Sequence, residues 1–202
     1  QNGYVPCARP RATYAAMIAY LDHTVGEIWK ALRETGQDQN TLIVFTSDNG
    51  AADNGGLDRA FFRSNGELRA GKMSLYEGGI RVPLVARWPG KIPPGTRTDH
   101  VAVCYDSLAT VCEAAGVQAP KTDGFSFLPA LMGQTPKPRP HVYFEYLEAS
   151  SMQAVILDGR HKVIRPNLKQ HPERTELYDL TTDPGEKNDL AAKHPELVEK
   201  GL

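Results

Sequence analysis

Apolar side chains recur along the first part of the chain at the spacing of a helix. They return every three or four positions, which predicts a helix over about residues 11–35 with one apolar stripe. The stripe comprises Tyr14, Met17, Ile18, Leu21, Val25, Ile28, Trp29 and Leu32. The following run, residues 41–46 (TLIVFT), is short, continuous and rich in β-branched residues. Such a run is typical of a strand covered on both faces in a parallel sheet, so the two segments together favour an α/β architecture.

A long polar segment separates this strand from the next one. Residues 47–79 are rich in glycine and lack periodicity, and loops of that length are usually functional or disordered. Residues 80–87 (IRVPLVAR) predict a second strand, in which Pro83 indicates a sheet edge or a bulge. A helix is expected over residues 106–115, with Asp106 at its N-terminus and Gly116 as its stop.

The pattern changes after the proline-rich segment 134–140. Residues 141–146 alternate as a strand, and residues 154–157 and 162–165 flank an Asp-Gly turn as a β-hairpin. A further strand is expected over residues 176–180 and a closing helix from about residue 195. We therefore divide the chain into an α/β body over residues 1–135 and a small α+β C-terminal subdomain over residues 136–202.

Composition and charge limit the classes of partner. Hydrophobic residues make up 41% of the 202-residue chain and charged residues 23%, as in ordinary globular proteins. The net charge of −1 gives no electrostatic reason to expect nucleic acid as a partner, and no apolar run approaches the roughly 18 residues of a membrane span. Three cysteines are too few for a disulfide framework. Because the chain opens on Gln1 rather than Met, we expect it to be part of a longer protein.

Two short segments carry residues suited to chemistry. Asp48 and Asn49 follow the strand at residues 41–46, at the end where ligands bind in α/β sheets, and both offer hard oxygen donors for Ca²⁺ or Mg²⁺. An ordinary Asp-Asn-Gly turn also explains these residues, and spacing alone favours that interpretation. Lys72 lies in a glycine-flanked loop about twenty residues later, where a lysine is suited to bind an oxyanion such as phosphate or sulfate. Taken alone, Lys72 is more simply an exposed loop lysine.

Together these segments resemble the formylglycine-dependent sulfatases of the alkaline-phosphatase superfamily. The resemblance runs in order through LIVFTSDNG, LRAGKMSLYEGGIRVP, ARWPGKIPPGT, YDSLATVCEAAGV, TDGFSFLPALMG and ELYDLTTDPGEKNDL. It implies the C-terminal part of an α/β sulfatase domain. In such a chain a mixed or parallel sheet is flanked by helices and followed by a small antiparallel sheet and a C-terminal helix.

The same resemblance implies roles for individual residues. Asp48 and Asn49 would ligate an active-site Ca²⁺ (or Mg²⁺), and Lys72 would bind the substrate sulfate and act as a catalytic, charge-stabilising residue. Fixed cations around the ester oxygens would lower the barrier to cleavage. Glu77 and Arg81 are expected to brace the loop as ion-pair partners.

The polar loop 51–69 is expected to approach the substrate. Arg63, Asn65 and Arg69 are its candidates for contact with a sugar or another sulfated group. The expected partner is therefore a sulfated small molecule or carbohydrate, although the sequence does not identify the ester.

The family's nucleophile motif, Cys/Ser-x-Pro/Ala-x-Arg, has only an imperfect counterpart. Cys7 and Arg11 have the right separation, but Arg9 stands where Pro or Ala belongs, and the family's nucleophile lies far upstream of the Ser-Asp-Asn-Gly strand. We interpret Cys7 as a chance match. We expect the formylglycine and the remaining metal ligands in a missing N-terminal half, and hence no appreciable activity of this chain alone.

Two other functions stay open. One is a phosphonate or phosphate monoester hydrolase of the same superfamily, although those relatives often carry His where Asn49 stands here. The other is a non-catalytic sulfatase-like module. The missing half of the same protein is an expected partner, and an uncovered sheet edge could also support an oligomer. The absence of Asn-x-Ser/Thr sites and the few cysteines favour a bacterial protein, with the periplasm as its expected location.

Overall fold

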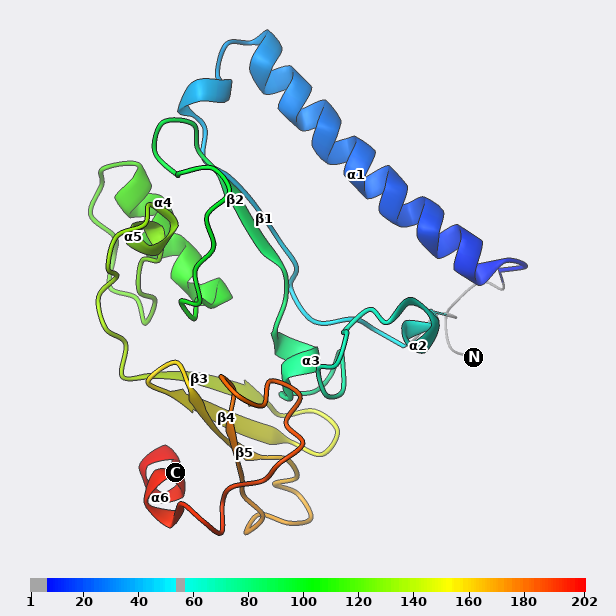
Figure 1. Cartoon of the computed structure of the whole chain (residues 1–202), viewed down its shortest axis with the longest axis vertical. Coiled ribbons are helices and arrows are strands. Elements are labelled where there is room, and N and C mark those ends of the chain that lie inside the picture. The colour runs from blue at the N-terminus through cyan, green and yellow to red at the C-terminus, as the bar shows by residue number, and fades with distance from the viewer. Residues whose placement is uncertain (1–6, 54–56) are drawn as a thin grey trace.

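A computed structural model describes residues 7–53 and 57–202. Figure 1 shows a long helix at one side, a narrow β ribbon beside a group of short helices, and a separate sheet next to the C-terminal helix.

Helix α1 (Pro10–Glu34) agrees with the predicted helix to within a residue at each end. Pro10 occupies its first turn, and Gly36, with a φ of 70°, follows its end. None of the α1 residues is buried within the described part of the chain, and most of its apolar stripe is exposed, with Tyr14, Val25 and Leu32 half-buried. Met17, for example, is 62% exposed.

The end of α1 is fastened by one carboxylate. The short 3₁₀ turn Asp38–Asn40 follows the helix, and Asp38 accepts a hydrogen bond of 2.8 Å from the indole Nε1 of Trp29. The guanidinium of Arg87 donates to both carboxylate oxygens of Asp38, at 2.7 and 3.1 Å. Arg87 is the last residue of strand β2 (Leu84–Arg87), which forms part of the two-stranded ribbon. The Asp38 cluster therefore joins α1 to the ribbon.

The ribbon corrects one expectation from the sequence. Strands β1 (Ile43–Thr46) and β2 (Leu84–Arg87) pair antiparallel rather than parallel, with Ile43 opposite Arg87 and Thr46 opposite Leu84. Their apolar residues are largely exposed, because no described helix packs over the ribbon; these include Val44, Phe45, Leu84 and Val85. The predicted burial on both faces is therefore not found in this chain.

Four short helices lie between and after the two strands. They are α2 (Arg59–Phe62), α3 (Glu77–Ile80), α4 (Ser107–Ala114) and α5 (Leu128–Leu131), and a 3₁₀ turn (Cys104–Asp106) precedes α4. Helix α4 confirms the helix predicted over residues 106–115. Helix α3 occupies the start of the segment predicted as a strand from residue 80, so that strand begins only after Pro83.

The Asp106 side chain does not cap helix α4 as the sequence predicted. Its side chain makes no capping bond to α4 and instead accepts hydrogen bonds from the backbone N–H groups of Val103 and Phe125, each at 2.9 Å. It also pairs with the guanidinium of Arg139, and both charges are buried. One carboxylate thus ties the turn before α4 to the segment that leads into the C-terminal sheet.

The C-terminal sheet matches its prediction closely. It contains β3 (His141–Tyr146), β4 (Met152–Leu157), β5 (His161–Arg165) and β6 (Glu176–Asp179), antiparallel throughout and in the order β3-β4-β5-β6. Asp158 and Gly159 both have positive φ, at 53° and 68°, as the predicted Asp-Gly hairpin turn requires. Helix α6 (Pro195–Gly201) packs on this sheet.

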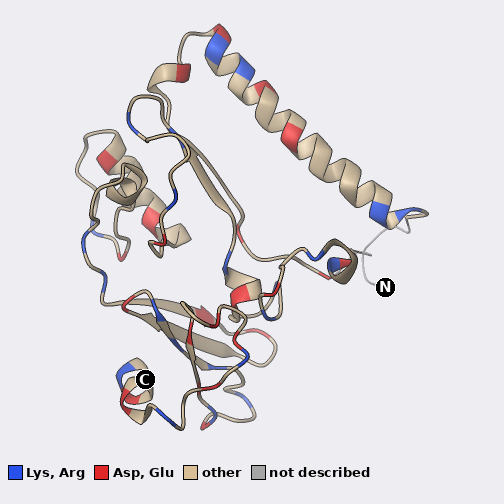
Figure 2. Ribbon diagram, in the orientation of Figure 1, with Lys and Arg blue, Asp and Glu red and all other residues tan. Residues whose placement is uncertain are grey.

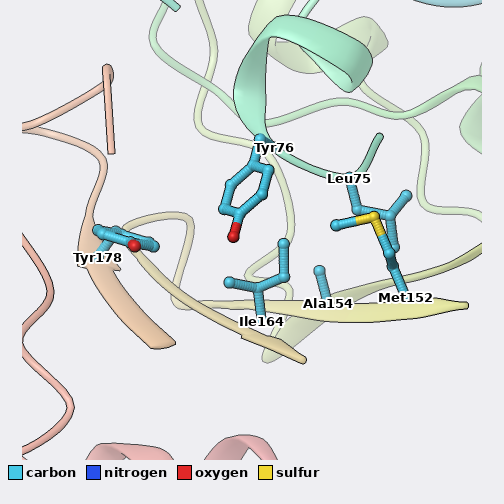
Figure 3. Close-up of a cluster of buried hydrophobic side chains, with 6 residues drawn as sticks. All are labelled: Leu75, Tyr76, Met152, Ala154, Ile164 and Tyr178. Atoms are coloured by element: carbon cyan, nitrogen blue, oxygen red, sulfur yellow. The ribbon is translucent and has the colours of Figure 1, made fainter. Parts of the chain in front are cut away.

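The larger buried cluster joins the two parts of the chain. Leu75 and Tyr76, which precede α3, pack against side chains of the C-terminal sheet (Figure 3). The sheet residues in this cluster are Met152, Ala154, Ile164 and Tyr178. The residues between Lys72 and α3 therefore pack on the C-terminal sheet. No helix in the described residues is long and apolar enough to cross a membrane.

Candidate active site

The candidate site begins where β1 ends. Asp48 is exposed and Asn49 is half-buried, in the turn directly after the strand. The Asn49 side-chain amide donates to the carbonyl of Gly50 at 3.1 Å, and the Ser47 hydroxyl donates to the carbonyl of Asn49 at 3.0 Å. These local bonds give the turn a defined shape while leaving the Asp48 side chain in contact with solvent.

Backbone hydrogen bonds bring this turn to the loop that carries Lys72. The Gly50 N–H donates to the carbonyl of Gly79 at 2.8 Å, and the Lys72 N–H donates to the carbonyl of Ala51 at 2.9 Å. Two segments separated by about twenty residues in sequence are therefore directly paired. The pairing bonds the backbone of Lys72 to Ala51, which follows Asp48 and Asn49 within the same turn.

Glycine makes this close approach possible. A Cβ atom added to Gly50 would lie 1.8 Å from the carbonyl oxygen of Gly78, a contact that no side chain can make. Two non-glycine residues, Ala70 and Met73, flank the Gly71-Lys72 pair with φ values of 60° and 71°. Left-handed conformations of such residues are uncommon and tend to occur where a loop is held by its surroundings. Lys72 itself is exposed.

Asn65 holds the two segments together. Its side-chain nitrogen donates to the carbonyls of Ala70 and Gly78, at 2.7 and 3.0 Å. Its side-chain oxygen accepts from the Ala51 N–H at 3.2 Å. One amide thus contacts the turn after β1 and both ends of the Lys72 loop, a bracing contact that the sequence did not predict.

Arg69 faces the C-terminal sheet. Its guanidinium stacks over the ring of Tyr76, 3.7 Å from the centroid, and donates to the Tyr178 hydroxyl at 2.8 Å. Glu176 lies 3.4 Å from the same guanidinium. Burial alone would raise the pKa of Glu176, but hydrogen bonds from Tyr76, Tyr178 and an arginine outweigh it and hold that pKa below its usual value.

Arg63 lies apart from these contacts. It follows α2 with a φ of 48° and is exposed. It lines a surface hollow of about 270 Å³ together with Asp53, Arg59 and Asn65. The structure therefore pairs the backbone of the turn after Asp48 and Asn49 with that of the Lys72 loop, and Asn65 contacts both segments as well as the hollow that Arg63 lines.

The donors at the strand end suit a divalent cation but do not complete its coordination. Asp48 and Asn49 are adjacent and supply oxygen ligands of the type that Ca²⁺ and Mg²⁺ prefer. Among the described residues, no group of three or more His, Cys, Asp and Glu side chains could hold a metal ion. Since Ca²⁺ takes about six to eight oxygens, these two residues could supply only part of a site.

Cys7 is exposed at the start of the described chain. Its Sγ lies 3.1 Å from the Thr13 hydroxyl oxygen, and this hydrogen bond lowers the pKa of the thiol. The contact anchors the cysteine to the first turn of α1.

Basic and acidic residues are interspersed along the described chain rather than gathered by sign (Figure 2).

Comparisons with known proteins decide the family. The family model described as Sulfatase matches residues 2–117, more than half of the chain. The chain belongs to the sulfatase family. A second model, described as N-sulphoglucosamine sulphohydrolase, C-terminal, matches residues 69–200, so the chain corresponds to a C-terminal portion of a sulfatase.

Individual relatives agree with this assignment. The sulfatase chain is 33% identical to an N-acetylgalactosamine-6-O-sulfatase of Bacteroides thetaiotaomicron, over 92% of this chain and 40% of that protein. It is 31% identical to arylsulfatase A of Homo sapiens, over 94% of this chain and 42% of the relative. The crystal structure of Ps i-CgsB in complex with k-i-k-neocarrahexaose superimposes with a TM-score of 0.82 at 30% identity, covering 96% of this chain and 42% of that one.

The comparisons also show how much of each relative's length the chain matches. The sulfatase chain spans about two fifths of the length of each of these relatives. The expected fold class, an α/β portion of a sulfatase followed by an antiparallel sheet and a helix, is confirmed.

Proposed function

We propose that this chain carries part of the active site of an enzyme that hydrolyses an organic sulfate ester. Lys72 binds the sulfate group and stabilises the charge that develops on its oxygens during cleavage. The observation that carries the proposal is the pairing of the Lys72 loop with the turn after β1, through the Lys72–Ala51 and Gly50–Gly79 hydrogen bonds of 2.9 and 2.8 Å.

Asp48 and Asn49 are proposed as two of the ligands of a Ca²⁺ (or Mg²⁺) ion. The exposure of the carboxylate and the chemistry of both donors support this assignment. A bound divalent cation would supply positive charge to the sulfate oxygens. The chain's own contribution is to hold the two oxygen donors and the ammonium group on paired segments of backbone.

We further propose that the nucleophile, a formylglycine, and the remaining metal ligands lie outside these 202 residues. The chain alone is therefore expected to show no appreciable turnover. Its natural partner is the N-terminal portion of the same sulfatase, which would cover the apolar stripe of α1 and the exposed face of the β1–β2 ribbon. The exposure of both surfaces and the two-fifths coverage of relatives support this proposal.

The substrate is proposed to be a sulfated carbohydrate or another small sulfate ester. Relatives with this type of name include the N-acetylgalactosamine-6-O-sulfatase of Bacteroides thetaiotaomicron. Arg63, exposed beside the hollow of about 270 Å³, is the loop residue best placed to reach such a group. The bacterial relative is also consistent with a periplasmic location.

The proposal is tested in a complete sulfatase polypeptide that carries this chain. Lys72→Ala should lower kcat/KM for an aryl sulfate by about 10²–10³-fold, the usual cost of losing one charge-stabilising group. Lys91→Ala, at another exposed loop lysine, is the matched control and should change it little. Equal values for the two variants would contradict the proposal. An aryl phosphonate assayed in parallel tests the alternative hydrolase, which a higher kcat/KM for the phosphonate would favour.

The partial metal site has its own test. Calorimetric titration of the isolated chain with Ca²⁺ should show weak or no binding. The complete polypeptide should bind Ca²⁺, and the Asp48→Ala substitution should lower its affinity for the ion. Asp53→Ala, which removes an exposed loop carboxylate, is the control. Unchanged calcium affinity of the complete polypeptide on Asp48→Ala would exclude Asp48 as a ligand.

A further inference from the structure

A fully buried lysine contacts the first residue of α3, the helix that follows the Lys72 loop. Lys162, on β5, is 0% exposed, and its Nζ lies 3.0 Å from the Glu77 carboxylate and 2.8 Å from the Glu186 carboxylate. The side chains of Glu77 and Glu186 are 5% and 0% exposed. Three charged groups from three separate segments of the chain therefore meet away from water.

Such an arrangement is costly unless each charge is matched. Burial raises the pKa of Glu186, and the positive charge of Lys162 opposes that shift. Arg81 lies 3.6 Å from the second oxygen of Glu77 and is half exposed, so two cations face two carboxylates. Because apolar side chains can stabilise a core at least as well, a buried ion cluster is more informative about position than about stability.

The cluster holds α3 by its first residue. Glu186 accepts a hydrogen bond of 2.7 Å from the Glu77 backbone N–H, while Lys162 holds the Glu77 side chain. Glu77 is thus fixed through both its backbone and its carboxylate to residues of the C-terminal part. This two-point attachment sets where α3 begins relative to the sheet.

Backbone hydrogen bonds connect α3 to the candidate site. The carbonyl of Gly79, in α3, accepts the Gly50 N–H, and the Gly78 N–H donates to the carbonyl of Arg69 at 2.8 Å. Lys72 lies between Arg69 and α3, so both ends of its loop are tied to the helix. A shift of α3 would move Lys72 relative to the turn after β1.

We propose that Lys162 is a positioning residue, which sets the place of the substrate-binding Lys72 by anchoring α3 through Glu77 and Glu186. The inference rests on the proposed function of Lys72. Sequence reasoning predicted Glu77 and Arg81 as ion-pair partners, and the structure confirms that pair. The sequence reasoning did not identify Lys162 as a partner, because Lys162 lies 85 residues beyond Glu77.

Hydrogen exchange of the 202-residue chain tests the anchoring directly. Lys162→Met keeps an unbranched chain of similar length and removes the charge. It should speed amide exchange at Gly78 and Gly79 by roughly a hundredfold or more, beyond any change at α4. Lys200→Met is the matched control, because it removes an exposed lysine that pairs with Asp158 at 3.0 Å. Equal, uniform increases across all segments would reduce Lys162 to a general stability role and overturn the proposal.

Glu77→Gln provides a second variant in case Lys162→Met does not fold. It preserves the shape of the side chain and removes only the charge that faces Lys162. The expected result is the same selective increase in exchange at Gly78 and Gly79, by at least about tenfold. Exchange at these amides indistinguishable from the Lys200→Met control would overturn the proposal.

Kinetics in a complete polypeptide separate positioning from stability. If Lys162 acts through Lys72, Lys162→Met should lower kcat/KM for an aryl sulfate, yet cause no further loss in a Lys72→Ala background. Independent, multiplicative losses would contradict a positioning role. If Lys72→Ala alone has no effect, the proposed function fails, while the exchange experiment still decides whether Lys162 anchors α3.

Discussion

Replacement of Gly50 by alanine should separate the turn after β1 from the Lys72 loop. The added Cβ would lie 1.8 Å from the carbonyl oxygen and 2.8 Å from the carbonyl carbon of Gly78. Both are backbone atoms, so no rotamer change relieves the overlap. The same carbonyl is held by Asn65 at 3.0 Å, which limits its freedom to move away.

The magnitude follows from two contributions. Overpacking of a close contact costs about 1–3 kcal/mol, and weakening of the Gly50–Gly79 hydrogen bond adds about 0.5–1.5 kcal/mol. We therefore expect a loss of about 2–4 kcal/mol in the free energy of unfolding. Gly26 provides the control, because it lies within α1 and an added Cβ there meets no atom within 4 Å. Gly26→Ala should instead stabilise, by up to about 1 kcal/mol.

Urea unfolding of the 202-residue chain, followed by circular dichroism, measures both variants. With an m-value of about 2 kcal/mol/M, Gly50→Ala should lower the midpoint by roughly 1–2 M without changing the slope. Faster exchange of the Lys72 amide, which bonds to Ala51, should accompany the loss. A midpoint for Gly50→Ala equal to or above that of the unsubstituted chain would refute the close-approach argument.

Three other substitutions test the contacts that surround the site. Leu75→Ala should cost about 2–5 kcal/mol in urea unfolding, because Leu75 is buried against the C-terminal sheet; a cost below 1 kcal/mol would contradict that packing. Tyr178→Phe removes a hydroxyl that donates to Glu176 at 2.8 Å and should cost about 1–3 kcal/mol by the same assay, whereas no change would show the bond to be dispensable. Hydrogen bonds from Arg87 hold the pKa of Asp38 below its usual range against the opposing effect of burial. Since this folded-state pKa is lowered, the resulting stability is present above the unfolded value of about 3.9 and is lost as pH falls through the folded value. The melting temperature of Asp38→Asn should therefore fall less at acid pH than that of the unsubstituted chain. Identical dependence of the melting temperature on pH in the two proteins would contradict this role of Asp38.

The elements that were predicted correctly are those with strong local signals. Helix α1 agrees with its predicted bounds because an apolar residue recurs at each turn and because Gly36 can adopt the left-handed conformation that ends it. The β4–β5 hairpin was found from Asp158 and Gly159, whose positive φ values match the turn. In both cases the decisive information lies within a few residues of the element.

The arrangement of the site depends on contacts between distant segments. The sequence identified Lys72 and Asp48 as members of one site only through the order of family motifs. Their proximity arises from backbone bonds at Gly50 and Ala51, which have no side-chain signature. The bracing role of Asn65 is equally hidden, because its three partners are backbone groups. Spacing alone therefore could not distinguish a functional turn from an ordinary one.

The error over β1 has a physical explanation that bears on the whole chain. A continuous apolar run such as Leu42–Phe45 indicates that both faces of a strand are covered, yet Val44 and Phe45 are 41% and 40% exposed here. The stripe of α1 presents the same mismatch, with Met17 and Ile28 exposed. Exposed contiguous apolar surface is costly in water and marks sites of association. The hydrophobic pattern is thus better explained by burial in a complete sulfatase, as we propose, than by the contacts within these residues. On that basis, the prediction was wrong about burial of β1 within these residues but informative about the surface that, as we propose, another part of the protein would cover.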